Sequence, residues 1–247
     1  MPRANRIFCT GHIWHITHRC HQREFLLKFL RDRRCWRHWL FEAKRRYGLS
    51  VLNYIATSNH IHLLCADQGR DEIPRSLQLI QGRVAQEYNS RKGRRGAFWE
   101  DRYHATAVQA DGHLAKCMTY IDLNMVRAHA VEHPRQWEVC GFNEILCPPW
   151  RKQIIDFPSL FRLLNVETHE HLATMRNHLV RQEIGRTRRA PAWTESVAVG
   201  DENYLQHVKS DLGLRGAHKR VVTEGGIQTL SEDRPGYWPV LGPKTPD

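Results

Sequence analysis

The sequence predicts an α+β fold in which an antiparallel sheet has the ferredoxin-like order β-α-β-β-α-β. Strand-like apolar runs alternate in that order with segments of helical periodicity between residues 8 and 108. One more helical segment follows the last strand, and beyond Pro148 and Pro149 the pattern changes to helix-like pieces. We therefore expect one domain over residues 1–150 and a mostly helical accessory extension over residues 151–247.

Each predicted element of the first domain is bounded by a recognisable residue pattern. In chain order we expect a strand at 8–20, a helix at 24–47, strands at 51–57 and 60–65, a helix at 71–88, a strand at 103–108 and a helix at 111–128. The first helix has apolar side chains at a spacing near 3.6, with Trp36 and Trp39 expected in the core, and Gly48 ends it. Asp111 is the expected N-cap of the last helix.

The extension carries weaker signals. Helices are expected at about 157–165, 168–184 and 201–213. The stretch from Gly225 is rich in Gly and Pro, so we expect it to be poorly ordered.

Charge points to a polyanionic partner. The 247 residues carry a formal charge of +11, and the first 50 contain 12 Lys and Arg against three Asp and Glu. A basic cluster of this kind is typical of nucleic-acid binding. Nothing in the chain resembles a membrane span, a signal peptide or a nucleotide-binding loop, so we expect a cytoplasmic, nucleoid-associated protein without a small-molecule substrate. The seven cysteines lack a C-x-x-C pair and predict neither disulfides nor a cysteine zinc site.

Two histidines flank one apolar residue in the third predicted strand. Because side chains alternate across a strand, His60 and His62 project from one face while Ile61 points into the core. Two adjacent imidazoles can chelate one divalent cation. By contrast, His12, His15, His18 and His21 are spaced by three and cannot share a face, so we expect a solvent-facing or DNA-facing strand there rather than a metal cluster.

A second pattern lies on the last predicted helix of the domain. Tyr120 and Asn124 are four residues apart and therefore lie on one helix face. If that face meets the histidine pair, the result is a His-His-Asn metal site with a tyrosine hydroxyl beside it. Such a site suits phosphodiester transesterification, in which tyrosine attacks phosphorus. Tyr103 is the alternative nucleophile, while His104 and His113 are expected to be structural.

These motifs resemble those of a known family. His60 to Leu64 resembles the signature of the HUH endonucleases, and Tyr120 to Ala128 resembles the tyrosine helix of their single-tyrosine, IS200-like transposase branch. Within that branch the chain is most similar to the REP-associated tyrosine transposases, and Phe98 to His104 adds a third matching segment. Met125 and Ser58 stand where many relatives have proline, which leaves the subgroup open.

The resemblance implies roles for individual residues. Tyr120 would be the nucleophile, and His60, His62 and Asn124 would bind Mg²⁺ or Mn²⁺. The substrate would be single-stranded DNA beside a palindromic repeat hairpin, cut through a 5′-phosphotyrosine. From the distribution of basic charge, we expect Arg19, Arg94, Arg95 and Arg127 to contact DNA, although Arg19 and Arg127 could equally be simple surface charges.

Several alternatives stay open at this point. The chain could be a catalytically silent, hairpin-binding regulator, or it could belong to a replication-initiator or relaxase branch. It could act as a monomer or a homodimer. The basic run from Arg186 to Arg189 could extend the DNA contact or serve packing.

Overall fold

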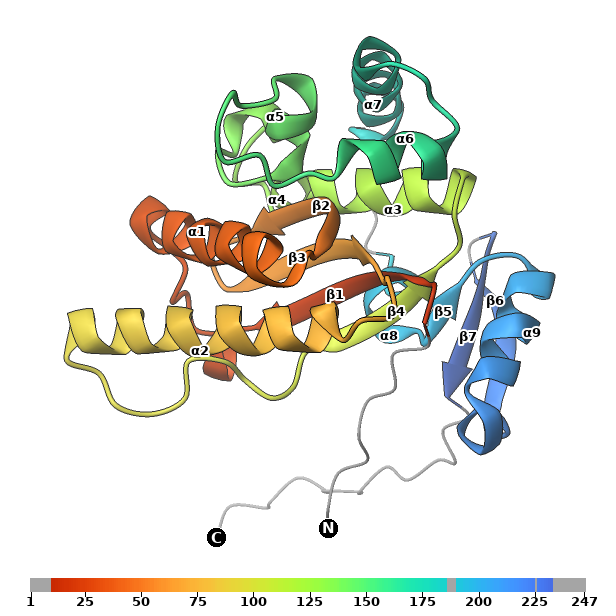
Figure 1. Cartoon of the computed structure of the whole chain (residues 1–247), viewed down its shortest axis with the longest axis horizontal. Helices are drawn as coiled ribbons and strands as arrows, with labels where there is room; N and C mark the ends of the chain where they lie inside the picture. Colours follow the sequence, from red (N-terminus) through yellow and green to blue (C-terminus); the bar gives the residue numbers. More distant parts are fainter. Residues whose placement is uncertain (1–9, 186–189, 225, 233–247) are drawn as a thin grey trace, which may run out of the picture.

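The first four strands form an antiparallel part of a seven-stranded sheet and confirm the predicted fold class (Figure 1). The computed structural model describes residues 10–185, 190–224 and 226–232. The elements of the predicted unit are β1 (Ile13–Arg19), α1 (Leu30–Tyr47), β2 (Ser50–Ala56), β3 (His60–Ala66), α2 (Glu72–Lys92) and β4 (His104–Val108). The strands lie in the order β2-β3-β1-β4, and each neighbouring pair is antiparallel.

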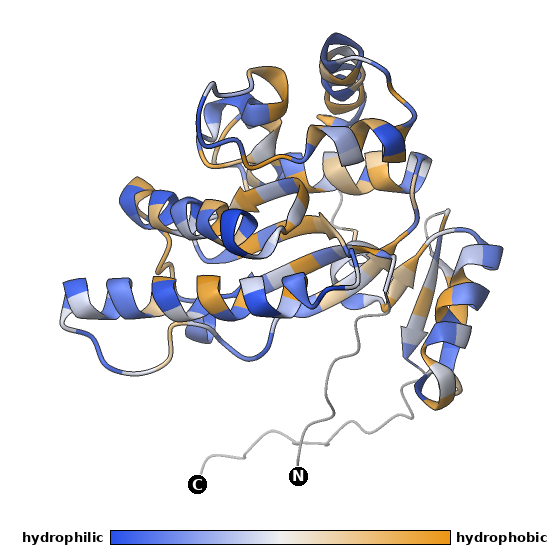
Figure 2. Ribbon diagram, in the orientation of Figure 1, coloured by the Kyte–Doolittle hydropathy of each residue, from blue (hydrophilic) through white to orange (hydrophobic). Residues whose placement is uncertain are grey.

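Helices cover both faces of this sheet. α1 and α2 pack side by side, and Trp36 of α1 meets Tyr54 of β2 with ring centroids 6.1 Å apart. The preceding residue on β2, Asn53, points to the opposite face of the sheet and bonds α3 (Gly112–Asp122). In Figure 2, β2 and β3 are largely hydrophobic, whereas α2 is hydrophilic along much of its length. Trp36 and Trp39 are both in the core, as the sequence predicts.

The helix predicted over 111–128 is interrupted. α3 ends at Asp122, Leu123 takes φ −80° and ψ 4°, and α4 spans Asn124–Arg127. Asp111 precedes α3 but does not cap it through its side chain, because its own backbone is at φ 61° and its N–H donates to the carbonyl of Leu163. Asp111 therefore stands at the predicted N-cap position, but its side chain makes no capping hydrogen bond.

The extension contains strands that the sequence pattern did not predict. Its helices are α6 (Phe157–Leu164), α7 (His169–Glu183), α8 (Ala192–Glu195) and α9 (Glu202–Asp211). Its strands β5 (Ala198–Val199), β6 (Lys219–Glu224) and β7 (Ile227–Glu232) extend the sheet to the order β2-β3-β1-β4-β5-β7-β6. β5 pairs parallel to β4, so the complete sheet is mixed.

Strand β7 also corrects the expectation that the chain is poorly ordered from Gly225 onward. β6 and β7 form a hairpin with six paired positions. Residues 233–247, on which the rest of that expectation falls, lie outside the described residues, as do Arg186 to Arg189. The remaining elements are η1 (His21–Arg23), η2 (Pro134–Gln136), α5 (Gly141–Leu146) and η3 (Gly213–Gly216).

Among the described helices, none has both the length and the apolar character needed to span a membrane. The six cysteines within the described residues are free thiols.

A buried polar network fixes α3 between β2 and α7. The Asp122 carboxylate accepts a hydrogen bond from Asn53 Nδ2 at 2.8 Å and forms an ion pair with Arg176, and both charged side chains are fully buried. Arg176 also donates to the hydroxyl of Thr119 at 3.0 Å. A buried charge needs partners of this kind, because its desolvation is costly. The network therefore sets the position of α3 on the sheet.

Replacing Arg176 tests that role. Arg176→Met leaves the Asp122 carboxylate buried without its cation, so we expect the free energy of unfolding to fall by about 3–5 kcal/mol. Urea denaturation followed by circular dichroism measures the change. The control is Arg34→Met, which breaks an exposed ion pair with Glu138 and should have little effect. Similar losses in the two variants would contradict a special role for Arg176.

Candidate active site

The two histidines of the motif share one sheet face, as strand alternation predicts. In the pairing of β1 with β3, Thr17 lies opposite His62 and Arg19 lies opposite His60. The imidazole rings of His60 and His62 have centroids 4.9 Å apart. Ile55 of β2 pairs with His62, and it lies on the same sheet face as Asn53, which bonds Asp122 of α3. The two histidines therefore lie on the sheet face that α3 covers.

The junction of α3 and α4 brings Tyr120 and Asn124 to the same point. Asn124 Nδ2 donates to His62 Nε2 at 2.9 Å. The Asn124 side chain also partly opposes the lowering of the His60 pKa. The Tyr120 ring lies edge-on to His62 with centroids 5.9 Å apart. The interruption at Leu123 leaves this arrangement intact, since the backbone bonds from Leu123 N to Thr119 O and from Arg127 N to Leu123 O continue across it. The structure thus collects the four residues singled out by sequence.

A third histidine, His15, belongs to the same cluster and was not identified from the sequence. His15 Nδ1 donates to the carbonyl of Trp193 at 2.8 Å, so its neutral ring has Nε2 as an acceptor. That atom lies 2.9 Å from His62 Nδ1, which must therefore be the donor. The chain of bonds holds His62 as the Nδ1–H tautomer and leaves the Nε2 lone pair directed at Asn124.

His60 is held in the same tautomer by its own neighbours. Its Nδ1 lies 2.8 Å from Asn59 Oδ1 and 2.9 Å from Thr57 Oγ1. A carbonyl oxygen only accepts, so Nδ1 carries the proton and Nε2 keeps its lone pair. Metal-binding histidines are characteristically oriented by a second hydrogen bond of this type.

Burial keeps these imidazoles neutral. Desolvation lowers the pKa of His15 to about 4 and that of His60 to about 4, and it holds the pKa of His62 well below its usual value. Arg19 and Arg127 lower the pKa of His62 further through their positive charges. Neutral imidazole is the form that binds metal.

The donor set fits a divalent ion. The Nε2 lone pair of His62 is directed at Asn124, and the His60 ring lies beside that of His62 with centroids 4.9 Å apart. Rotation of the Asn124 amide would present Oδ1 in place of Nδ2. Two imidazoles and one amide oxygen are an acceptable ligand set for Mg²⁺ or Mn²⁺, although it lacks an anionic ligand and should bind either ion loosely.

Arg127 lies directly against Tyr120. Its guanidinium carbon is 4.2 Å from the centroid of the tyrosine ring, and Nη2 donates to the backbone carbonyl of Tyr120 at 2.5 Å. A fixed positive charge beside a phenol stabilises its phenolate. Arg127 can therefore assist Tyr120 in addition to, or instead of, contacting DNA.

The other arginines differ in their surroundings. Arg19 is exposed at the end of β1, opposite His60. Arg94 donates to the carbonyl of Ala97 at 2.8 Å and pairs with Glu24, so its side chain holds the α2–β4 loop together. Arg95 is exposed in the same loop. Farther along, the loop reaches the end of β1, where His21 N donates to Phe98 O.

The remaining candidates lie apart from the cluster or serve packing. The Tyr103 ring packs edge-on against His18, whose side chain points to the sheet face opposite that of His15. His104 Nε2 bonds the carbonyl of Ser196 at 3.0 Å. The first strand is not solvent-facing as expected, because His12, His15 and His18 are all buried beneath the extension and the α2–β4 segment.

Neutral buried histidines make stability depend on pH. Above the unfolded pKa near 6.5 they are neutral in both states and contribute nothing to the dependence. As the pH falls from 6.5 to about 4, the unfolded chain binds protons that the folded chain excludes, so stability decreases. For His15 alone the loss is on the order of 3 kcal/mol by pH 4.

The corresponding measurement is urea unfolding at a series of pH values between 7.5 and about 4. His15→Gln should flatten the dependence, because glutamine offers both a donor and an acceptor but does not titrate. An unchanged slope in His15→Gln would show that His15 titrates normally.

Comparison with known proteins agrees with the resemblance seen in the sequence. Residues 9–124 match the family model described as "Transposase IS200 like". Among solved structures, a REP-associated tyrosine transposase bound to a REP hairpin matches with 19% identity and a TM-score of 0.50, over 64% of this chain and 95% of that one. A candidate transposase from Deinococcus radiodurans R1 matches with 16% identity and a TM-score of 0.34, over 49% and 96%. No curated protein matches the chain.

A little under half of the chain therefore matches the IS200-like transposase family, and the fold is similar to that of the REP-associated tyrosine transposase. The matched segment contains His60, His62, Tyr120 and Asn124, and it ends before Arg127 and Trp193.

Proposed function

We propose that the protein is a metal-dependent endonuclease and transesterase that cuts single-stranded DNA near palindromic hairpins through a 5′-phosphotyrosine intermediate. The observation that carries the proposal is the position of Tyr120 beside His62, which contacts both the His60 ring and the Asn124 amide. The match of residues 9–124 to a transposase family supports it.

The residues of the chain divide the chemistry among them. His60, His62 and Asn124 would hold Mg²⁺ or Mn²⁺, which when bound polarises the scissile phosphate. Arg127, fixed against Tyr120, favours its phenolate. The phenolate oxygen bonds to phosphorus as the bond to the 3′-oxygen breaks, and the 3′-oxygen takes up a proton. The bond to tyrosine conserves the energy needed for rejoining, so the reaction needs no nucleotide cofactor.

Hairpin DNA is the proposed target. The structural neighbour is bound to a REP hairpin, and this chain has a basic N-terminal part with Arg19 exposed opposite His60. We extend the DNA contact to Arg95 and Arg127, with Arg94 shaping the loop. A monomer and a homodimer both agree with this proposal.

The alternative is a regulator that binds hairpins without cutting them. Such a protein would not need the bonds that orient His60 and His62, nor the guanidinium fixed against Tyr120. These features favour the enzyme.

Tyr120→Phe separates the two functions. A labelled single-stranded oligonucleotide with a hairpin should give, with wild-type protein and Mn²⁺, a covalent adduct that survives a denaturing gel. Tyr120→Phe removes only the hydroxyl, so the adduct should disappear while hairpin affinity stays within about twofold. Tyr103→Phe is the matched control and should retain the adduct. EDTA should also abolish it.

Two outcomes would contradict the proposal. An adduct that persists in Tyr120→Phe would place the nucleophile elsewhere, with Tyr103 the first candidate. Tight hairpin binding by wild-type protein, with no adduct for any flanking sequence, would establish the regulator.

His15 should act on metal affinity through His62. His15→Phe removes the acceptor that holds the His62 proton on Nδ1, so we expect Mn²⁺ affinity to fall by about tenfold or more, measured by calorimetric titration without DNA. His15→Gln can donate to Trp193 and accept from His62, and it should restore most of the affinity. Equal affinities in wild type and His15→Phe would remove this role.

A further inference from the structure

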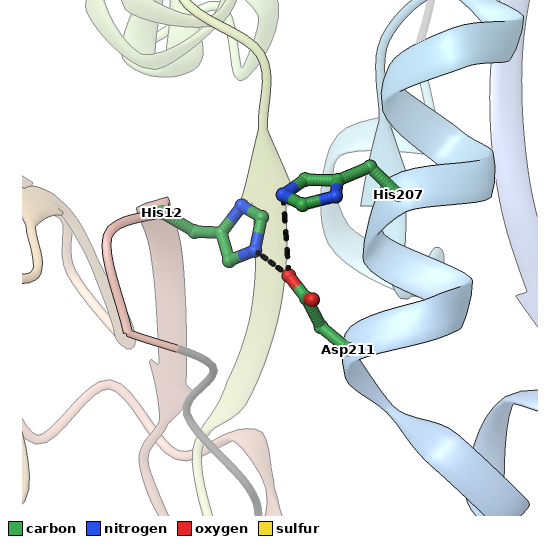
Figure 3. Close-up of side chains that lie close together, drawn as sticks. All are labelled: His12, His207 and Asp211. Carbon is green, nitrogen blue, oxygen red and sulfur yellow. Dashed lines mark hydrogen bonds and ion pairs between the residues drawn. The ribbon is translucent and has the colours of Figure 1, made fainter.

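Three possible metal ligands meet at the junction between β1 and α9, away from the site described above (Figure 3). His12 immediately precedes β1, while His207 and Asp211 lie one turn apart on α9. His12 Nε2 is 3.0 Å from Asp211 Oδ2, and His207 Nε2 is 3.5 Å from the same oxygen. Figure 3 shows both imidazoles turned toward that carboxylate.

The spacing of these atoms suits a small tetrahedral ion. With bonds of about 2.0–2.1 Å, a tetrahedral Zn²⁺ ion keeps its ligand atoms about 3.3 Å apart. The two measured distances lie on either side of that value, and all three ligand atoms lie within 4.8 Å of one another. His207 is the most exposed of the three side chains, so its ring is free to make the remaining adjustment.

The surroundings of His12 also match those of a metal ligand. Its side chain is 6% exposed, and its Nδ1 lies 3.2 Å from the hydroxyl of Tyr204, which is also on α9. A proton on Nδ1, donated to that hydroxyl, leaves the Nε2 lone pair pointing at Asp211. A buried, oriented imidazole joined by an exposed imidazole and carboxylate leaves the fourth position of the ion open to water.

We propose that His12, His207 and Asp211 bind a transition-metal ion of the zinc type, which fastens α9 of the extension to the start of β1. Two imidazoles and one carboxylate are a typical ligand set for Zn²⁺. The site is separate from the proposed catalytic one. Thr17 of β1 pairs with His62, and His12 lies five residues before Thr17, which is roughly 16 Å along the strand. The zinc site does not depend on the proposed function.

The consequence of such a clamp follows from what it joins. β1 carries His15, and the extension carries Trp193, whose carbonyl orients His15. An ion at the β1–α9 junction would favour the docked extension, since binding to the folded arrangement alone stabilises that arrangement. Zinc bound here would therefore support the geometry of the catalytic histidines without touching them.

Zinc binding by the untagged, full-length chain tests the proposal. The experiment is equilibrium dialysis against ZnCl₂ in a His60→Ala, His62→Ala background, which removes the proposed catalytic ligands. We expect one tightly bound Zn²⁺ per chain, lost in His207→Ala and in Asp211→Asn. His178→Ala, at an exposed position of α7, is the matched control and should keep the ion. Tyr204→Phe should weaken binding by about tenfold or more.

Thermal unfolding supplies a second readout. Saturating Zn²⁺ should raise the melting temperature of the background protein and of His178→Ala but not that of His207→Ala. If the double-alanine background does not fold, the comparison is made without it. His207→Ala should then bind one Zn²⁺ per chain fewer than the wild-type protein. The proposal is overturned if no stoichiometric zinc binds, or if His207→Ala binds as much as His178→Ala. The cluster would then be a hydrogen-bonded junction without metal.

Discussion

The buried ion pair between Asp122 and Arg176 is the contact on which the candidate site most depends. Tyr120 lies two residues before Asp122 and Asn124 two residues after it, so any shift of this carboxylate moves both. Because Asp122 also accepts from Asn53 of β2, the helix is fixed relative to the strand beside the one that carries the histidines. An apolar interface would bury α3 as well, but it would tolerate sliding. Directional bonds to two elements do not.

A second constraint is that several imidazoles are buried together on the same sheet face. They stay neutral, and their nitrogen atoms are paired in a fixed order from the Trp193 carbonyl through His15 to His62. The first acceptor in that order belongs to the extension, beyond the 9–124 segment that matches the transposase family. The extension is therefore part of the structure that shapes the site and is not merely attached to a finished domain.

The sequence predicted features that depend on local spacing. His60 and His62 share a face because a strand alternates, and Tyr120 and Asn124 share one because four residues make about one helical turn. That these two pairs of residues form one site was predicted from the family resemblance. His15 and Trp193 were beyond reach, since their contact joins residues 178 positions apart. β5 has only two residues, too few to show any alternation. The break at Leu123 leaves the apolar periodicity almost unchanged, so it too left no signal.

The parallel pairing of β5 with β4 changes which strand lies at the exposed edge of the sheet, where a strand of another chain could pair. In a four-stranded sheet of this order β4 would be an edge, with a row of unpaired amides and carbonyls open to strand addition. The extension moves that edge outward to β6, which carries Lys219 and Arg220 near its start. At the other edge, β2 makes single bridges to Ile155 and Cys140. Both edges of the sheet are in this way protected against unwanted pairing with strands of other chains.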